Sequence, residues 1–459
     1  MAEDTKAAPR WGLLEWFLIA QTALPAMLLL PGSQAFRLPL RVAPFALSLL
    51  ATACLFRPTN RSVRVHPAAW WLVLAVIDLG IMIIHPETNG VVAGVAHVAL
   101  YVSVFAPLFW VPGLVGSAER LPRLLAILLV SSGLNALVGV LQVYDPATWM
   151  PAEFSTIKVT SQFGLENVSY VGRDGVRVVR PPGLFDNPGA VCAPGAVAAL
   201  LGFVFALSPI RPWQRSLSAI CALVGAAAIY LSHVRAAFVV LLGMAAFYVM
   251  MLCMHRRFAT AVTFGLLVVA VGAGGLGVAA ALGGQSVIDR FSTLGEAPLQ
   301  VYAAGRGEFL VEDFTFLLHD HPLGAGLGRW GATFVYFGGA TSRSPLEPGI
   351  EVQPNAWIVD GGIVLVVLYV MALLWNGIRE LNTVRRAQTP ALKTWGASIF
   401  ALNAGTCLLI FSFTPFTTQT GLQYWFLAGL LYGAAHAVRA AAPDDRPGAV
   451  RRSQPEMTA

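Results

Sequence analysis

The chain has 459 residues, of which 56% are hydrophobic and only 12% are charged, and its mean hydropathy is +0.67. Soluble globular proteins carry about 25% charged residues, so this composition excludes an ordinary soluble enzyme and indicates a polytopic membrane protein. The net charge of +6 does not predict nucleic-acid binding, because basic residues beside membrane spans set topology. We therefore expect the lipid bilayer as a partner and no nucleic acid.

Apolar windows of about twenty residues, the length that a membrane-spanning helix needs, follow one another along the chain. Hydrocarbon offers no partners for unpaired backbone amides, which favours helices. The windows predict an all-α polytopic membrane protein with about 12 transmembrane helices, forming a single membrane domain over residues 1–459. They are 11–30, 38–56, 68–84, 91–111, 121–143, 189–207, 216–231, 236–254, 259–282, 356–375, 394–413 and 420–438.

Lysine and arginine in the short connections indicate the orientation of the bundle. With the N-terminus in the cytoplasm, most basic residues of the short connections fall inside, as does the tail at 439–459. Two long connections, 144–188 and 283–355, then face outwards. The short outer connections hold only Arg37, Arg41 and Arg235.

The second long connection contains the stretch EFLVEDFTFLL, residues 308–318. Its apolar residues recur at helical spacing, which predicts an amphipathic helix on the membrane surface or on the bundle. Neither long connection resembles a separate soluble domain. The residues of the apolar face are Leu310, Phe314, Leu317 and Leu318.

Three outer-face arginines are candidates for ligand binding. Arg235 interrupts the apolar stretch YLSHVRAAFVV, Arg180 lies in RVVRPPGLFDNPG, and Arg306 lies in AAGRGEFLVEDF. An isolated interfacial arginine can simply extend its charge towards the headgroups. Three that converge would suit a lipid-linked phosphate or diphosphate, because guanidinium groups bind phosphate oxygens bidentately.

These stretches resemble segments of the O-antigen ligase and polysaccharide polymerase superfamily. RPPGLFDNPG, which contains Asn187, is similar to the Gly-x-Phe-x-Asn-Pro motif of that family, and SHVRAAF resembles its Ser-Arg-Gly-Ala hairpin. GRGEFLVEDFTFLLHDHPLGAGLGRWG resembles the stretch that begins with a functional arginine, here Arg306, and ends in Pro-x-Gly-x-Gly-x-Gly.

The resemblance implies a C-type glycosyltransferase fold in the bacterial inner membrane, with both termini cytoplasmic and two long periplasmic loops. It implies an inverting, metal-independent transfer of a glycan from undecaprenyl diphosphate, with no cofactor. The acceptor would be another glycan unit or lipid A–core. Arg235 and Arg306 would be catalytic, while Arg180, Asn187 and His233 would contact the substrate.

One departure from the family pattern bears on the reaction. Ligases carry His-Asn before the tenth span, whereas here the stretch EVQPNAWIVDGG has Pro354 before Asn355. Proline cannot act as a base, so we expect a polymerase more than a ligase. Asn355 is then a substrate-binding residue. Asp360 is the expected catalytic carboxylate, with Glu351 and His233 as other candidate bases.

Two other functions remain open at this stage. A secondary transporter with twelve spans would have internal repeats and a site at the bilayer midplane, where Asp78 is the one clear charge. A family member without catalysis, acting in assembly, is the other. The His319-Asp320-His321 stretch is not expected to bind a metal, since residues i and i+2 do not share a helix face.

Overall fold

The computed structural model describes residues 11–56, 65–150, 166, 168–171, 175, 177–296, 298–338 and 350–441. Its regular structure is almost entirely helical, apart from an antiparallel hairpin of β1 (Ser169–Val171) and β2 (Arg177–Val179). The α-helices are α1 Leu13–Ala26, α2 Arg37–Leu55, α3 Ala69–Met82, α4 Val91–Phe105, α5 Pro107–Trp110, α6 Leu121–Tyr144, α7 Pro146–Trp149, α8 Cys192–Ala206, α9 Pro212–Leu231, α10 Arg235–Met254, α11 Phe258–Gly283, α12 Gln285–Glu296, α13 Pro298–Tyr302, α14 Glu308–Glu312, α15 Leu318–Asp320, α16 Gly331–Phe337, α17 Gln353–Arg385, α18 Ala397–Leu409 and α19 Gln419–Ala441.

A helix lies on each of the apolar windows that the sequence predicts. Among the described residues, six helices are long and apolar enough to cross a membrane, namely α2, α9, α10, α11, α17 and the helix that ends with α6. A seventh is added if α4 and the segment Pro107–Leu114, which meet at a bend of 41°, count as one span. The structure thus supports an all-α membrane protein, and a total of twelve spans stays a prediction.

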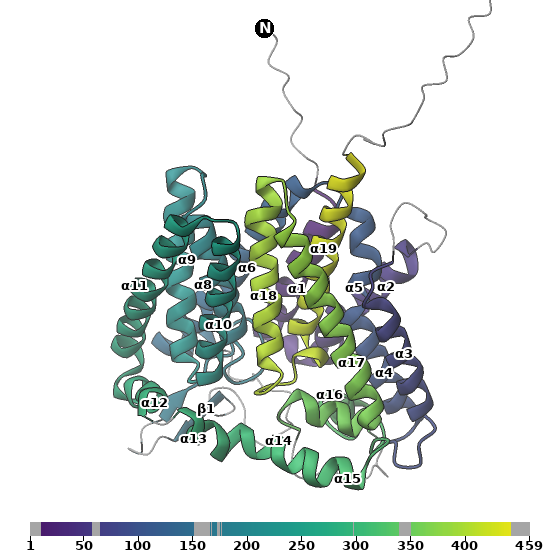
Figure 1. Cartoon of the computed structure of the whole chain (residues 1–459). Coiled ribbons are helices and arrows are strands. Elements are labelled where there is room, and N and C mark those ends of the chain that lie inside the picture. The colour runs from purple at the N-terminus through teal and green to yellow at the C-terminus, as the bar shows by residue number, and fades with distance from the viewer. Residues whose placement is uncertain are drawn as a thin grey trace, which may run out of the picture.

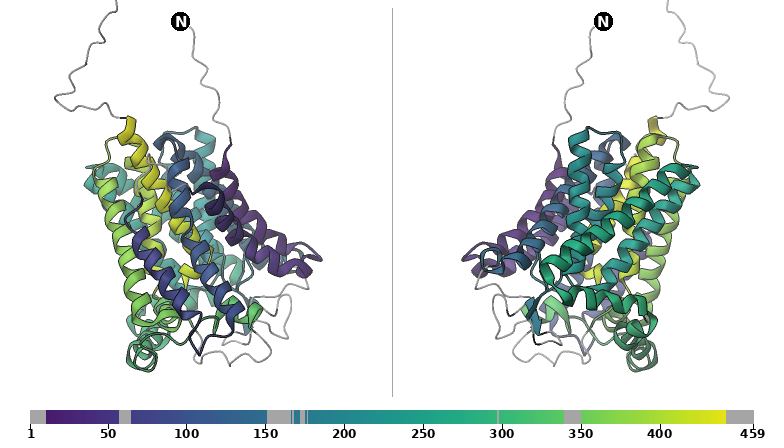
Figure 2. Two further views of the ribbon diagram at one scale, coloured as in Figure 1. Left: turned by 90° about the vertical axis from the view of Figure 1, so that its right-hand side faces the viewer. Right: turned by 90° about the vertical axis from the view of Figure 1, so that its left-hand side faces the viewer.

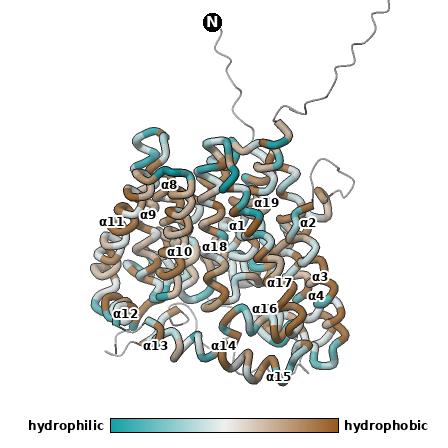
Figure 3. Tube along the Cα trace, viewed as in Figure 1, coloured by the Kyte–Doolittle hydropathy of each residue, from teal (hydrophilic) through white to brown (hydrophobic). Residues whose placement is uncertain are grey.

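The described parts of both long connections lie at one end of the bundle. Figure 1 shows β1 and α12 to α16 at the lower end, whereas α19 ends at the upper end. In Figure 3, hydrophobic residues dominate the helices of the bundle, and most of the hydrophilic segments gather towards its two ends. We call the lower end the loop end.

The predicted helix over 308–318 is confirmed. Helical turns continue from α13 to α15, with π-helical turns at Ala303–Gly307 and Asp313–Leu317. Leu310, Leu317 and Leu318 are half-buried, while Phe314 is exposed. Figure 1 shows this segment running across the loop end of the bundle. Its exposed apolar residues are Leu299, Tyr302, Val311, Phe314 and Phe316.

The helix α17 is broken at Gly361 and Gly362, where the backbone leaves helical geometry. The glycine-rich turn after His321 stabilises the break, because it supplies hydrogen bonds that the helix lacks there. Ala325 N donates to Val359 O at 2.7 Å, and Ile363 N donates to Pro322 O at 3.0 Å. The eight residues before the break, 353–360, are all buried.

Two large apolar clusters hold the bundle together. One is built mainly from α6, α8, α10, α18 and α19, and the other from α3, α4, α17 and α19. The helix α11 packs on α9 but keeps much of its surface exposed: only 11% of its most apolar window is buried. It therefore forms an exposed, apolar edge of the bundle.

Candidate active site

The connection between α9 and α10 is a tight hairpin of three residues on which two arginines converge. Arg180 Nε donates to Ser232 O, and Arg290 Nε donates to His233 O, each at 3.4 Å. The two carbonyls are consecutive in the chain. Arg180 comes from the first long connection and Arg290 from α12 in the second, so both connections meet at this hairpin.

Arg235 begins α10 directly after the hairpin. Its Nη1 donates to Thr293 Oγ1 at 2.8 Å, and Thr293 Oγ1 in turn donates to Arg290 O at 2.9 Å. The helix α12 is therefore docked so that Arg235 and Arg290 lie near each other. Thr293 thus links Arg235 to Arg290, a residue that the sequence motifs do not single out.

Arg306 approaches from the π-helical turn between α13 and α14. Its guanidinium pairs with Glu351, whose half-exposed side chain lies just before α17. Burial, together with the positive charges of Arg290 and Arg306, lowers the pKa of Arg180. Arg306 therefore lies close enough to Arg180 for their charges to interact.

Together these residues form the arginine cluster, which we define as Arg180, Arg235, Arg290 and Arg306. Within the described part of the chain, Glu351 is the one carboxylate that forms an ion pair with it. Of the four guanidinium groups of the cluster, only that of Arg306 forms an ion pair among the described residues. Like charges at short range are unfavourable, so this arrangement favours a bound anion.

His233 lies in the hairpin itself, with its backbone in the left-handed region at φ 58°. A non-glycine residue is strained there and is commonly found at functional sites. Its side chain is buried, and Nδ1 has no hydrogen-bond partner among the described residues. Burial, with the charges of Arg290 and Arg180, lowers the pKa of His233 to about 4, so the imidazole is neutral at pH 7. The ring of Tyr170 meets it edge to face.

The loop that follows Arg180 is held by polar residues of α6. Gln142 exchanges two hydrogen bonds of 2.9 Å with the backbone of Gly183, and Asn135 Oδ1 accepts from Leu184 N at 3.0 Å. Gly183 has φ of 66°, and a Cβ there would lie 2.1 Å from Asn135 Oδ1. At the end of the loop, the carbonyl of Asn187 accepts from the backbone of Ala190. The side chain of Asn187 is half-buried.

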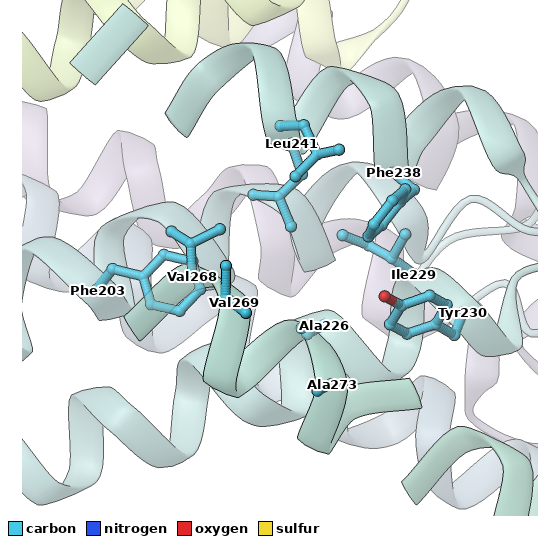
Figure 4. Close-up of a pocket in the computed structure, with 11 residues that line it drawn as sticks. Phe203, Ala226, Ile229, Tyr230, Phe238, Leu241, Val268, Val269 and Ala273 are labelled. Atoms are coloured by element: carbon cyan, nitrogen blue, oxygen red, sulfur yellow. The ribbon is translucent and has the colours of Figure 1, made fainter. Parts of the chain in front are cut away.

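An apolar crevice of about 200 Å³ lies between α9, α10 and α11. Figure 4 shows Ile229, Tyr230 and Phe238 at one end and Phe203 and Val268 at the other. Tyr230 and Phe238 both pack against Phe291 of α12, which directly follows Arg290. Phe238 lies one turn after Arg235 on α10. The aromatic end of the crevice is therefore next to the arginine cluster.

Asp360 lies in a separate buried network at the break of α17. Its Oδ2 accepts from Tyr101 at 2.8 Å and is 2.9 Å from His97 Nε2, and its Oδ1 accepts from Trp330 Nε1 at 2.8 Å. The Asp360 side chain is fully buried, and none of these contacts involves the arginine cluster. Asn355 is also buried, and its Oδ1 has no hydrogen-bond partner within the described ranges.

Pro354 lies in the first turn of α17. Proline is favoured at this position, because the first backbone N–H groups of a helix have no partner within it. Pro354 thus lies near the start of the buried segment 353–360 that leads to Asp360.

Two features of this site were missed by sequence reasoning. Arg290 could have been found by the criterion that identified Arg306, because both are basic residues in the second long connection. The partners of Asp360 gave no local signal, because His97 and Tyr101 lie about 260 residues away in the chain.

No model of a known protein family matches the chain, and no curated protein sequence matches it either. The interpretation of the site therefore depends on the geometry of the described residues and on their chemistry.

Proposed function

We propose that the protein is a membrane glycosyltransferase that transfers or polymerises a glycan linked to undecaprenyl diphosphate. The observation that carries the proposal is the arginine cluster next to an apolar crevice at the loop end of the bundle. The cluster suits the two phosphates, and the crevice suits part of a hydrocarbon tail. A free sugar nucleotide would need no such crevice.

In the proposed reaction, the hydroxyl oxygen of the acceptor forms a bond to the anomeric carbon of the donor. The bond from that carbon to the phosphate oxygen breaks, and its electron pair stays on the departing diphosphate. The arginine cluster stabilises this growing negative charge, an effect that is worth about 3–4 kcal/mol per well-placed donor in other enzymes. No metal is needed for this stabilisation.

The acceptor proton needs a base in reach of the site. Glu351 contacts the cluster through Arg306 and is half-exposed, so a substrate can approach it. Diphosphate binding to Arg306 would release Glu351 from its ion pair. Asp360, the expected catalytic carboxylate, is fully buried with both oxygens hydrogen-bonded. We therefore propose that Glu351 is the base and that Asp360 positions the start of α17.

The loop end would face the periplasm of a bacterial inner membrane, with both termini in the cytoplasm. The acceptor would be a further lipid-linked repeat unit, since Pro354 replaces the histidine of ligases. An O-antigen ligase that acts on lipid A–core is the alternative. A secondary transporter is the further alternative, and the broken helix α17 facing Asp78 is the observation that favours it. In that case, the glycine-rich turn that occupies the break of α17 would have to move away from it.

The test is photo-crosslinking of the purified chain with an undecaprenyl diphosphate that carries a photoreactive group on its hydrocarbon tail. We expect peptides of α9, α10 or α11 to be labelled, and Arg235→Gln to reduce the labelling. A matched control is Arg177→Gln, which removes an exposed arginine at the same end of the bundle. Labelling that is equal in the chain and in Arg235→Gln would contradict the proposal.

A further inference from the structure

A second pair of arginines lies at the loop end, away from the hairpin between α9 and α10. Arg37 and Arg41 are one turn apart on α2, and Ser33 lies one turn before them. Arg41 forms a nearly buried ion pair with Asp186, and its guanidinium lies 5.6 Å from the ring centre of Tyr336 on α16. We call these five residues the α2 site.

Several polar atoms of the α2 site are buried without a hydrogen bond to any described residue. They are Nε and Nη2 of Arg37, Oγ of Ser33 and the hydroxyl of Tyr336. Buried polar groups nearly always have hydrogen-bond partners. All these groups can donate, so they match a ligand that is rich in acceptor oxygens.

The charge of the α2 site also favours an anion. The carboxylate of Asp186 acts on both guanidinium groups, and the five residues that define the α2 site include two arginines and this one acid. Asp186 is already engaged with Arg41 Nε, whereas the free donors of Arg37 point to a second partner. A phosphate group would supply it, because a guanidinium binds two phosphate oxygens at once.

One loop connects this site to the arginine cluster. The backbone of Gly189 donates to Arg180 O at 3.1 Å, which closes the loop 180–189 on itself. Arg180, at its start, reaches the hairpin between α9 and α10, and Asp186, within it, reaches α2. The two basic sites therefore lie on either side of a single short loop that α6 holds in place.

Much of the surface of α2 is exposed, which leaves the α2 site open to lipids of a surrounding bilayer. Only 17% of the most apolar window of α2 is buried, and Phe36, next to Arg37, is 65% exposed. In Figure 2, α1 and α2, drawn in purple, lean away from the rest of the bundle towards the loop end. A lipid could thus place its headgroup phosphate at Arg37 while its tails stay in the membrane.

We propose that the α2 site binds the phosphate group of the acceptor lipid, so that donor and acceptor occupy the two sides of the loop 180–189. This inference rests on the proposed function, because only a transferase needs an acceptor. The phosphate belongs to a second lipid-linked repeat unit if the protein is a polymerase, and to lipid A–core if it is a ligase.

The test is to count bound lipids by native mass spectrometry of the full chain with lipid-linked repeat units, with lipid A–core, or with phosphatidylglycerol. We expect two repeat units per chain, or one repeat unit and one lipid A–core. Arg37→Gln should retain the donor and lose the second lipid. Arg235→Gln should lose the donor and retain the second lipid. Arg177→Gln, the matched control, should retain both.

Two milder variants guard against misfolding. Tyr336→Phe removes one hydroxyl, and Arg37→Lys keeps the positive charge but loses the planar guanidinium that can bind two oxygens at once. Each should weaken binding of the second lipid by about tenfold and leave donor binding unchanged. Unchanged binding in all three variants would overturn the inference, as would a second site that phosphatidylglycerol fills equally well. Failure of Arg235→Gln to reduce donor binding would instead count against the proposed function.

Discussion

At the scale of single residues, the arginines of the cluster differ in the groups that they contact. Arg235 and Arg290 are linked through Thr293, and Arg306 faces Glu351. Arg180 and Arg290 also anchor the hairpin through their bonds to Ser232 O and His233 O. All four add positive charge, but they differ in how freely they can turn to a ligand.

We predict that Arg235→Ala and Arg306→Ala insert normally but reduce glycan transfer by about 10²–10³-fold, the usual effect of losing one anion-stabilising donor. Lysine at either position should recover only part of the activity, since a point charge cannot bind two oxygens. Arg290→Ala should have a comparable effect, and Arg180→Ala a milder one. Transfer by the purified variants is the measurement, with Arg177→Ala as control. Full activity of Arg235→Ala would mean that Arg235 has no role in transfer and serves only to anchor the chain at the membrane surface.

The neutral state of His233 gives a prediction on pH. Burial lowers its pKa to about 4, and the charges of Arg290 and Arg180 add to this effect. We predict that Arg290→Ala raises the pKa of His233 from about 4 towards its ordinary value of about 6.5. NMR titration of labelled histidine measures this shift, and His233→Asn assigns the signal among eight histidines.

A bound diphosphate should shift the pKa of His233 in the same direction, because its negative charge favours the protonated imidazole. Donor binding would then take up a proton between about pH 4 and 6.5 and would strengthen as the pH falls through that range. An unchanged pKa in both experiments would mean that the arginine charges do not act on His233.

At the scale of elements, the break of α17 depends on the glycine-rich turn that fills it. Gly326 has φ of 90°, and a Cβ there would lie 2.5 Å from the backbone of Glu87. Gly362 has φ of 61°, and a Cβ there would lie 2.2 Å from Pro322 O. Both positions require glycine because backbone atoms, which cannot swing aside, occupy the space.

We predict that Gly326→Ala or Gly362→Ala destabilises the protein by about 2–4 kcal/mol, the sum of left-handed backbone strain and overpacking. Thermal unfolding in detergent should show a Tm lower by several degrees. The matched control is Gly265→Ala in α11, where nothing lies within 4 Å of the new Cβ, and it should be neutral or slightly stabilising. Equal Tm values for all three variants would mean that the turn does not support the break.

The sequence predicted the helices well and their contacts poorly, for a physical reason. An apolar run of sufficient length specifies a helix locally, so a helix formed on each predicted window, and the amphipathic stretch at Leu310–Leu318 is helical. Convergence of Arg180, Arg235 and Arg306 followed only from topology. The Asp360 network joins residues from α4, α17 and the turn before α16, and no local pattern specifies such pairing. Asp360 therefore looked like an accessible carboxylate, although it is buried.

At the scale of the whole molecule, orientation is the first property to test. We predict that reporters inserted near Gly172 and Gly339 behave as periplasmic and that a reporter after Arg439 behaves as cytoplasmic. Gly172 and Gly339 lie outside the described residues, but they belong to connections whose described parts lie at the loop end. A cytoplasmic signal from either connection would place the arginine cluster on the wrong side for a periplasmic donor.

The identity of the product is the second property of the whole molecule. We predict chain elongation when purified protein receives lipid-linked repeat units alone, because Pro354 leaves no histidine at the ligase position and Glu351 can take the acceptor proton. The measurement is the length distribution of the glycans on a gel. Glu351→Gln should then slow elongation, because the amide cannot accept the proton of the acceptor hydroxyl. Asp360→Asn should lower Tm together with activity, because it disturbs the hydrogen bonds from Tyr101 and Trp330. Transfer that begins only after lipid A–core is added would instead identify a ligase that works without that histidine.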